Sequence, residues 1–125
     1  DLERKENGPY EIKVGNLNSV RTYTHIKDAI MAYWLAYEKG TVGEIYNIGT
    51  NFTCTVGEAL EMLIKFSTID REDFNVIVDP ARVRPTDITL QVPDWSKFNK
   101  HTGWKPTLQT EDICKDLLDY WRGEK

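Results

Sequence analysis

The sequence has few of the features that mark metal-bound, secreted or nucleic-acid-binding proteins. Its two cysteines, Cys54 and Cys114, form no zinc-ligand pattern, so we expect no metal and two buried thiols in a reducing compartment. No run of Lys and Arg occurs, and 16 basic against 20 acidic residues give a net charge of −4, which argues against a nucleic-acid partner. No apolar run is long enough for a membrane span and no signal-peptide pattern opens the chain, so we expect a cytoplasmic protein.

Recognisable catalytic and nucleotide-binding motifs are also missing. The chain contains no G-x-G-x-x-G, the dinucleotide fingerprint, and no G-x-x-x-x-G-K-[ST] phosphate loop. Its serines lie outside any G-x-S-x-G context. The histidines are His25 and His101; neither has an obvious nucleophile or metal-ligand partner, and His25, at a helix start, is expected to make a structural hydrogen bond. We therefore predict no catalytic, metal-binding or cofactor-binding residue in this chain.

What is present is the composition of a soluble globular domain. Of 125 residues, 40% are hydrophobic and 29% are charged, which is enough apolar material for one core and predicts a single domain over residues 1–125. The chain does not begin with Met, and a dense charged run over residues 1–6 leads directly into a strand-like segment. We therefore expect a piece of a longer chain.

Residue periodicity predicts a small mixed α/β domain with about three to five short strands and four helices. Strand patterns cover residues 10–14, 20–24, 44–48 and 74–78, with a short extended piece at 88–92. Helical patterns cover residues 25–39, 55–67, 94–100 and 110–122. Thr55 and Glu58 fit a capping box, and Trp104 lies in a turn where it is expected to be buried. In the last helix, Ile113, Leu117 and Trp121 are expected to point inward.

Two arginine-bearing stretches suit an anionic ligand. Arg21 follows Gly15 and Asn16 just ahead of the first long helix, where backbone N–H groups favour a phosphate. About sixty residues further on, Arg82 and Arg84 lie between two prolines that stiffen the backbone. Because Arg82 and Arg84 are two residues apart, an extended backbone points both to the same side, and periodicity does not choose between them.

These residues suggest a nucleotide diphosphate site. Arg21 and Arg84 are suited to converge on one diphosphate through charge-assisted hydrogen bonds. Asp87 can accept from ribose hydroxyls, and Asn16 can both donate and accept at a base or ribose edge. The alternative interpretation is that the arginines are surface salt-bridge partners in an acidic domain.

At these residues the chain resembles the C-terminal, substrate-binding part of an extended short-chain dehydrogenase/reductase, and most closely the GDP-mannose 4,6-dehydratases. The first matching stretch, Gly15-Asn-Leu-Asn-Ser-Val-Arg-Thr-Tyr-Thr-His-Ile-Lys-Asp28, is similar to the family pattern G-N-L-[DN]-x-x-R-[DT]-[WFY]-x-H-x-K-D. The other matching stretches follow in the family's order: Ala32-Tyr-Trp-Leu35, Gly43-Glu-Ile-Tyr-Asn-Ile-Gly49, Arg84-Pro-Thr-Asp87, Asp94-Trp-Ser-Lys97 and Thr102-Gly-Trp-Lys-Pro106.

The resemblance implies that this chain recognises the substrate of a larger enzyme. In that family a bound NADP takes hydride from C4 of GDP-mannose, water leaves across C5–C6, and hydride returns to C6. The resemblance places NADP and the family's Y-x-x-x-K pair in an N-terminal half outside this sequence; Tyr10 and Lys13, three apart, do not replace that pair. It implies that the chain alone is inactive and that the parent is a homo-oligomer.

The resemblance also assigns ligand roles by matched position. Arg21 and Arg84 are expected to hold the GDP diphosphate, Asn16 and Asp87 to meet the nucleoside, and Gly15 to allow a close approach. Substrate lobes of this superfamily pack against the dinucleotide domain, so we expect part of the surface to be an exposed apolar face.

Two alternatives remain open. Residues 32–47 also resemble GDP-4-keto-6-deoxymannose reductases, and other nucleotide-sugar epimerases or dehydratases share the fold, although His25 and Lys27 favour the dehydratase. An alternative of another class is a free-standing, non-catalytic binding domain.

Overall fold

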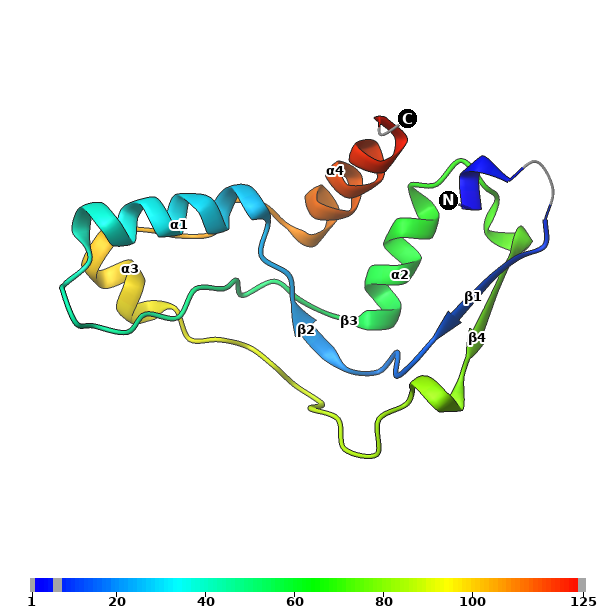
Figure 1. Cartoon of the computed structure of the whole chain (residues 1–125), viewed down its shortest axis with the longest axis horizontal. Helices are drawn as coiled ribbons and strands as arrows, with labels where there is room; N and C mark the ends of the chain where they lie inside the picture. Colours follow the sequence, from blue (N-terminus) through cyan, green and yellow to red (C-terminus); the bar gives the residue numbers. More distant parts are fainter. Residues whose placement is uncertain (1, 6–7, 124–125) are drawn as a thin grey trace.

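Four α-helices and four short strands, joined by long loops, make up the chain in the computed structural model, which describes residues 2–5 and 8–123 (Figure 1). The strands are β1 (Tyr10–Val14), β2 (Val20–Thr22), β3 (Thr53–Thr55) and β4 (Phe74–Val78). The helices are α1 (Ile26–Lys39), α2 (Val56–Lys65), α3 (Ser96–Thr102) and α4 (Thr110–Gly123). The predicted mixed α/β class and all four predicted helices are confirmed.

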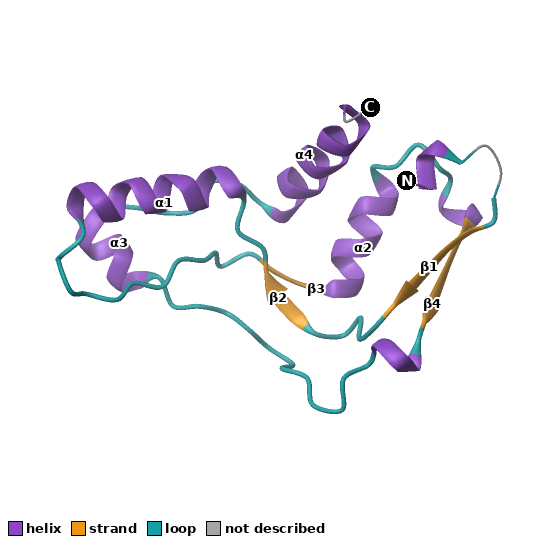
Figure 2. Ribbon diagram, in the orientation of Figure 1, coloured by secondary structure: helices purple, strands orange, loops and turns teal. Residues whose placement is uncertain are grey.

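The strands form two separate pairs. β1 and β4 run parallel, in register from Tyr10 opposite Phe74 at one end. β2 and β3 run antiparallel, with Val20 opposite Thr55. Figure 2 shows the two pairs on opposite sides of α2 in that view. An isolated bridge from Val20 to Leu90 also draws the long loop before α3 against β2.

Both α1 and α2 begin with a side-chain cap. Thr55 Oγ1 accepts from the Glu58 N–H at 3.0 Å while Glu58 Oε2 accepts from the Thr55 N–H at 2.7 Å, which confirms the capping box. At α1, Nδ1 of the buried His25 accepts from the Lys27 N–H at 3.1 Å, and Nε2 lies 3.1 Å from the Asp116 carboxylate of α4. His25 thus makes the predicted structural hydrogen bond and ties α1 to α4.

The core lies between α1 and α3, which pack together at one end of the molecule (Figure 1). Ala32, Phe98 and Trp104 are buried there, and the rings of Phe98 and Trp104 have centroids 5.6 Å apart. Trp104 Nε1 donates to the Asp28 carbonyl at 3.0 Å, while the Asp28 carboxylate accepts from the Thr107 hydroxyl at 2.7 Å. The burial predicted for Trp104 is confirmed.

Residues 44–48 form a loop, so the strand predicted there is wrong. The alternating side-chain pattern that led to the prediction is still present: Tyr46 and Ile48 contact the core, while Ile45 is largely exposed. Among the described residues no strand pairs with this segment, and a ladder needs a partner strand. The segment is held by a side chain instead, since Lys97 Nζ donates to the Ile45 carbonyl at 2.9 Å.

One face of α1 is apolar and exposed, as expected from the resemblance. It lies away from the buried Ala32, and its most exposed member, Tyr37, is 83% exposed. We call it the α1 face; its members are Ile26, Ile30, Tyr33, Trp34 and Tyr37. A contiguous apolar patch of this kind indicates a contact surface for another protein or domain.

The end of α4 buries less apolar surface than predicted. Cys114 is buried and its Sγ lies 3.9 Å from the Ala59 carbonyl of α2, so the first turns of α4 pack closely. Leu117 and Trp121, expected to point inward, are about half exposed instead. The reason is that Trp121 borders an open apolar cavity, described below, rather than a filled core.

Candidate functional site

The predicted site residues Asn16, Arg21 and Asp87 meet beside β2. Arg21 belongs to β2 and Asn16 to the loop that leads into it, whereas Asp87 lies in the long loop between β4 and α3. Backbone hydrogen bonding brings the two segments together, because the Val20 N–H donates to the Thr89 carbonyl at 2.8 Å. Segments distant in sequence therefore form one polar cluster.

The Asp87 carboxylate is the centre of this cluster. Its Oδ2 accepts from Asn16 Nδ2 at 2.8 Å and from the Ser19 hydroxyl at 2.5 Å, and its Oδ1 accepts from Arg21 Nη2 at 3.1 Å. The hydrogen bond from Ser19, followed by the one from Asn16, lowers the pKa of Asp87 below its ordinary value. The carboxylate is therefore ionised at neutral pH.

Arg21 is held in a fixed orientation by the protein. Its Nη1 donates to the Val20 carbonyl at 2.9 Å and to the Ile88 carbonyl at 2.7 Å, in addition to the Nη2 contact with Asp87. The side chains of Arg21 and Asp87 are 22% and 24% exposed, so the pair is partly shielded from water but still reachable by a ligand. A guanidinium fixed in this way is preorganised for a planar anion.

The cluster keeps unused hydrogen-bonding capacity. A guanidinium has five N–H donors, and the contacts of Arg21 within the described chain use three of them. One donor at Nε and one at Nη2 remain. The Asp87 carboxylate accepts from Asn16, Ser19 and Arg21, and a hydrogen bond from the Ile88 backbone also lowers its pKa. The remaining donors of Arg21 suit a phosphate oxygen.

Gly15 allows a close approach of the protein's own backbone. A Cβ at this position would lie 2.7 Å from the carbonyl oxygen of Arg82. Gly15 therefore lets the loop after β1 and the turn after β4 meet. The neighbour in the structure is a protein carbonyl, so a close approach of the ligand at Gly15 stays a prediction.

Arg84 is not brought into the polar cluster. It lies in the same loop as Asp87, three residues before it, and its side chain is exposed. In the described part of the chain it takes part in no hydrogen bond or ion pair, so its guanidinium is available to a ligand. Arg82, the other candidate, lies 3.6 Å from the Asp79 carboxylate and is also exposed. The ion pair occupies Arg82, which favours Arg84 as the second ligand-binding arginine.

Ser19 is the member of the cluster that the sequence did not predict. No G-x-S-x-G motif surrounds it, and no sequence motif gives it a role in binding. In the fold it is 2% exposed, and its hydroxyl accepts from Asn16 Nδ2 at 2.9 Å while donating to Asp87. Its partner Asp87 lies far away in the sequence, so no local pattern links the two residues. The one sequence signal for a binding role was the position of Ser19 between Asn16 and Arg21.

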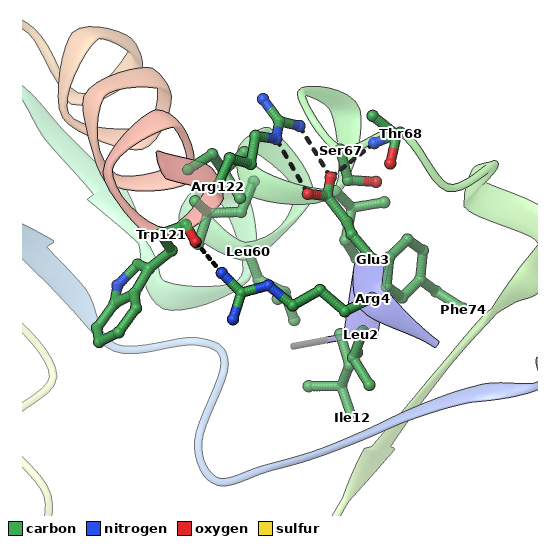
Figure 3. Close-up of a pocket in the computed structure, with 13 residues that line it drawn as sticks. Leu2, Glu3, Arg4, Ile12, Leu60, Ser67, Thr68, Phe74, Trp121 and Arg122 are labelled. Carbon is green, nitrogen blue, oxygen red and sulfur yellow. Dashed lines mark hydrogen bonds and ion pairs between the residues drawn. The ribbon is translucent and has the colours of Figure 1, made fainter. Parts of the chain in front are cut away.

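A separate apolar cavity of about 480 Å³ lies between β1, α2, α4 and the N-terminal residues (Figure 3). Its lining is mainly aliphatic and aromatic and includes Ile12, Leu60, Phe74 and Trp121. None of the predicted site residues lines it. The cavity is thus distinct from the polar cluster, and the basic side chains at its border, Arg4 and Arg122, are engaged in contacts within the protein.

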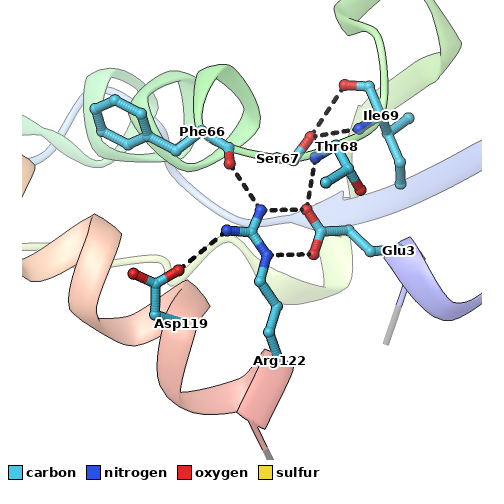
Figure 4. Close-up of polar contacts among 7 residues, drawn as sticks. All are labelled: Glu3, Phe66, Ser67, Thr68, Ile69, Asp119 and Arg122. Atoms are coloured by element: carbon cyan, nitrogen blue, oxygen red, sulfur yellow. Dashed lines mark hydrogen bonds and ion pairs between the residues drawn. The ribbon is translucent and has the colours of Figure 1, made fainter.

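An ion pair closes one side of this cavity. Nε and Nη2 of Arg122 donate to the two carboxylate oxygens of Glu3 at 3.0 and 2.8 Å, and Nη2 also donates to the Phe66 carbonyl at 2.8 Å (Figure 4). A third hydrogen bond to the Glu3 carboxylate comes from the Thr68 N–H at 2.7 Å. These contacts join both ends of the described chain to the end of α2, which is a structural role.

The described residues offer no other obvious chemical centre. No group of three or more His, Cys, Asp and Glu side chains among them is arranged to hold a metal ion. Cys54 and Cys114 are free and buried, and burial raises the pKa of both thiols. No helix in the described ranges is long and apolar enough to cross a bilayer.

The fold matches that of known enzymes. The NADPH complex of RMD from Pseudomonas aeruginosa superposes with a TM-score of 0.80 at 19% identity, covering 92% of this chain and 36% of that chain. The fold is therefore that of part of an extended short-chain dehydrogenase/reductase. Residues 3–117 match the family described as GDP-mannose 4,6 dehydratase. The chain belongs to the GDP-mannose 4,6 dehydratase family.

Its relatives carry different enzyme names. GDP-6-deoxy-D-mannose reductase of Pseudomonas aeruginosa is 24% identical over 110 residues, 88% of this chain and 35% of that protein. The dTDP-D-glucose 4,6-dehydratase of Homo sapiens is 30% identical over 104 residues, 82% of this chain and 29% of that protein. The chain spans about a third of the length of the curated relatives it matches.

Proposed function

We propose that this chain is the nucleotide-sugar-binding part of a GDP-mannose 4,6-dehydratase, which converts GDP-mannose to GDP-4-keto-6-deoxymannose and water. The observation that carries the proposal is the Arg21–Asp87 pair, held at 3.1 Å with two donors of Arg21 unused within the described chain. It occurs within the family match, at the positions that the sequence motifs single out. By this proposal the chain alone is inactive.

Each residue has a defined task in the proposed site. Arg21 and Arg84 bind the diphosphate, using the Nε and Nη2 donors of Arg21 and the exposed guanidinium of Arg84. Asp87 accepts from a ribose hydroxyl through Oδ1, and Asn16 lies beside it at the nucleoside end. Gly15 keeps the two loops close enough for both to reach one ligand.

The hydride chemistry is assigned to a part of the parent outside this chain. No glycine-rich dinucleotide loop occurs in the sequence, so these residues do not fit an NADP site. Hydride exchange with the sugar is what a bound NADP supplies, and this chain's contribution is to hold and orient the substrate. We further propose a cytoplasmic, homo-oligomeric parent.

The experiment uses the full-length parent with GDP-mannose and NADP, followed by NMR of the sugar. Appearance of GDP-4-keto-6-deoxymannose without net consumption of cofactor supports the dehydratase. Unchanged GDP-mannose, together with reduction of added GDP-4-keto-6-deoxymannose by NAD(P)H, overturns it in favour of a reductase.

A reductase is the second candidate, and a specific observation favours it. The relative from Pseudomonas aeruginosa named GDP-6-deoxy-D-mannose reductase matches over 88% of this chain. Both candidates share the GDP group, so both need the same diphosphate-binding arginines.

The alternative of a free-standing binding domain is tested by the reading frame upstream of Asp1. A dinucleotide-binding domain there supports the enzyme, and a start codon immediately upstream supports the binding domain.

A further inference from the structure

We propose that Ser19 is a positioning residue for the nucleotide-sugar site, which acts through Asp87 to fix both Arg21 and the loop that carries Arg84. The inference rests on the proposed function and assigns a role to a residue that no motif identified. Ser19 itself is 2% exposed and does not reach the ligand.

The backbone around Ser19 is anchored independently of the loop it would position. The Ser19 carbonyl accepts from the Val56 N–H in the first turn of α2 at 3.0 Å, and the next residue, Val20, pairs with Thr55 of β3. A capped helix and a strand pair therefore fix the origin of the Ser19 side chain. The Ser19 hydroxyl is therefore held in place by α2 and β3, and its position does not depend on the loop that carries Asp87.

The loop carrying Asp87 is joined to β2 by backbone hydrogen bonds that begin two residues after Asp87, from the Val20 N–H to the Thr89 carbonyl and from the Gln91 N–H to the Val20 carbonyl. Between Arg82 and Ser96 the chain contains no helix or strand, apart from the isolated bridge at Leu90. Asp87 is the earliest residue of that stretch whose side chain is bonded to the β2 region in the described chain. The hydroxyl of Ser19 and the amide of Asn16 thus determine where the loop begins to follow β2.

The position of Asp87 limits where Arg84 can lie. Three residues span at most about 11 Å when fully extended, so the Arg84 backbone stays within that distance of Asp87. Pro85 further restricts Arg84 to extended conformations. On the other side, Oδ1 of Asp87 orients the guanidinium of Arg21. Loss of the Ser19 hydroxyl therefore disturbs both proposed diphosphate ligands without removing either.

Both hydrogen bonds of the Ser19 hydroxyl are made to members of the polar cluster. It accepts from Asn16 and donates to Asp87, so the three side chains form a closed set around Asp87 Oδ2. Removing the hydroxyl leaves Asn16 as the remaining donor to that oxygen in the described chain. With one donor fewer, the partly exposed Asp87 carboxylate is held less firmly in the orientation that contacts Arg21.

The test measures KM and kcat for GDP-mannose in the full-length parent. Ser19→Ala is expected to raise KM about tenfold and to leave kcat and the melting temperature nearly unchanged, because a site hydrogen bond is lost while the helix and strand anchors remain. Ser19→Thr, which keeps the hydroxyl, is expected to restore KM. Ser96→Ala, an exposed serine at the start of α3, is the matched control and is expected to change neither constant.

A double-mutant cycle with Asp87→Ala separates positioning from general destabilisation. If Ser19 acts through Asp87, Ser19→Ala has no further effect on KM once Asp87 is absent. An unchanged KM in Ser19→Ala, or the same fold-change with and without Asp87, overturns the proposal. If the alanine variant does not fold, Ser19→Cys keeps the side-chain size with a weak donor and is expected to raise KM in the same way.

Measurements on the wild type separate two proposals: that GDP-mannose is the substrate, and that Ser19 positions the site. If the parent does not act on GDP-mannose, the proposed substrate is wrong, and dissociation constants for GDP, UDP and dTDP replace KM in the same set of variants. A wild type that binds one of these nucleotides, with weaker binding in Ser19→Ala, supports Ser19 alone. Equal binding by wild type and Ser19→Ala, or no binding by either, overturns the role of Ser19.

Discussion

Arg122 and Glu3, near opposite ends of the described chain, face each other with two hydrogen bonds of 3.0 and 2.8 Å. The Arg122 hydrogen bond lowers the pKa of Glu3 from 4.5 to about 2. Glu3 therefore stabilises the fold above its unfolded pKa, and this contribution is lost as pH falls from 4.5 towards 2.

The first prediction concerns this ion pair. Glu3→Gln is expected to lower the free energy of unfolding by about 1 kcal/mol at pH 7, since the pair is partly exposed and solvent screening reduces its strength. The difference between the variant and the wild type should shrink as pH falls below 4.5. Urea unfolding at pH 7 and pH 3 measures it, with the exposed Glu72→Gln as control. A difference that is the same at both pH values would contradict this assignment.

The second prediction concerns the start of α2. Thr55→Ala removes the acceptor for the Glu58 N–H and is expected to lower the free energy of unfolding by about 1 kcal/mol. Thr55→Ser keeps the oxygen and is expected to retain most of the stability. Thermal unfolding followed by circular dichroism distinguishes the two, and equal losses in both variants would show that the cap contributes nothing.

The third prediction concerns the α1 face. Because Trp34 and Tyr37 are exposed, the 125-residue chain is expected to self-associate in solution. Trp34→Glu should weaken this association about tenfold, since burial of a large side chain contributes about 1.5–3 kcal/mol. Sedimentation velocity over a concentration series measures the effect. Lys65→Glu, which adds a negative charge at the exposed end of α2, should leave association unchanged; an equal effect of both variants would point to charge rather than to this face.

The fourth prediction concerns the geometry of Arg21. Arg21→Lys keeps the charge but cannot maintain contacts to Val20, Ile88 and Asp87 while also binding a phosphate. Binding of GDP-mannose by the parent is expected to weaken by about 1.5–3 kcal/mol. Calorimetric titration checks this. Affinity equal to that of the wild type would mean that only the charge matters at this position.

Local sequence patterns were sufficient for most of the fold. The helix starts at Thr55 and near His25 depend on capping residues close in sequence, and the structure confirms them. The strands at 10–14 and 74–78 are also confirmed, because each supplies the other with a partner. The strand at 44–48 failed because a strand depends on a partner, and none of the described residues supplies one.

The site was predicted only in part for the same reason. Asn16, Arg21 and Asp87 carry motif signals and do come together. The role of Ser19 depends on a hydrogen bond to Asp87, a partner distant in the sequence, which no local pattern reveals. The neighbour of Gly15 is likewise a backbone carbonyl from the far loop. Periodicity left Arg82 and Arg84 equivalent, the family resemblance selected Arg84, and the contact of Arg82 with Asp79 is consistent with that selection.

Binding of the nucleotide-sugar diphosphate by this chain is tested best by comparing the two neighbouring arginines, Arg82 and Arg84. GDP-mannose is titrated calorimetrically into the full-length parent and into its Arg84→Ala and Arg82→Ala variants. The account predicts that wild type binds, that Arg84→Ala binds about 10- to 150-fold more weakly, and that Arg82→Ala stays within about twofold of wild type. Undiminished affinity in Arg84→Ala, or no binding by the wild type, would contradict it.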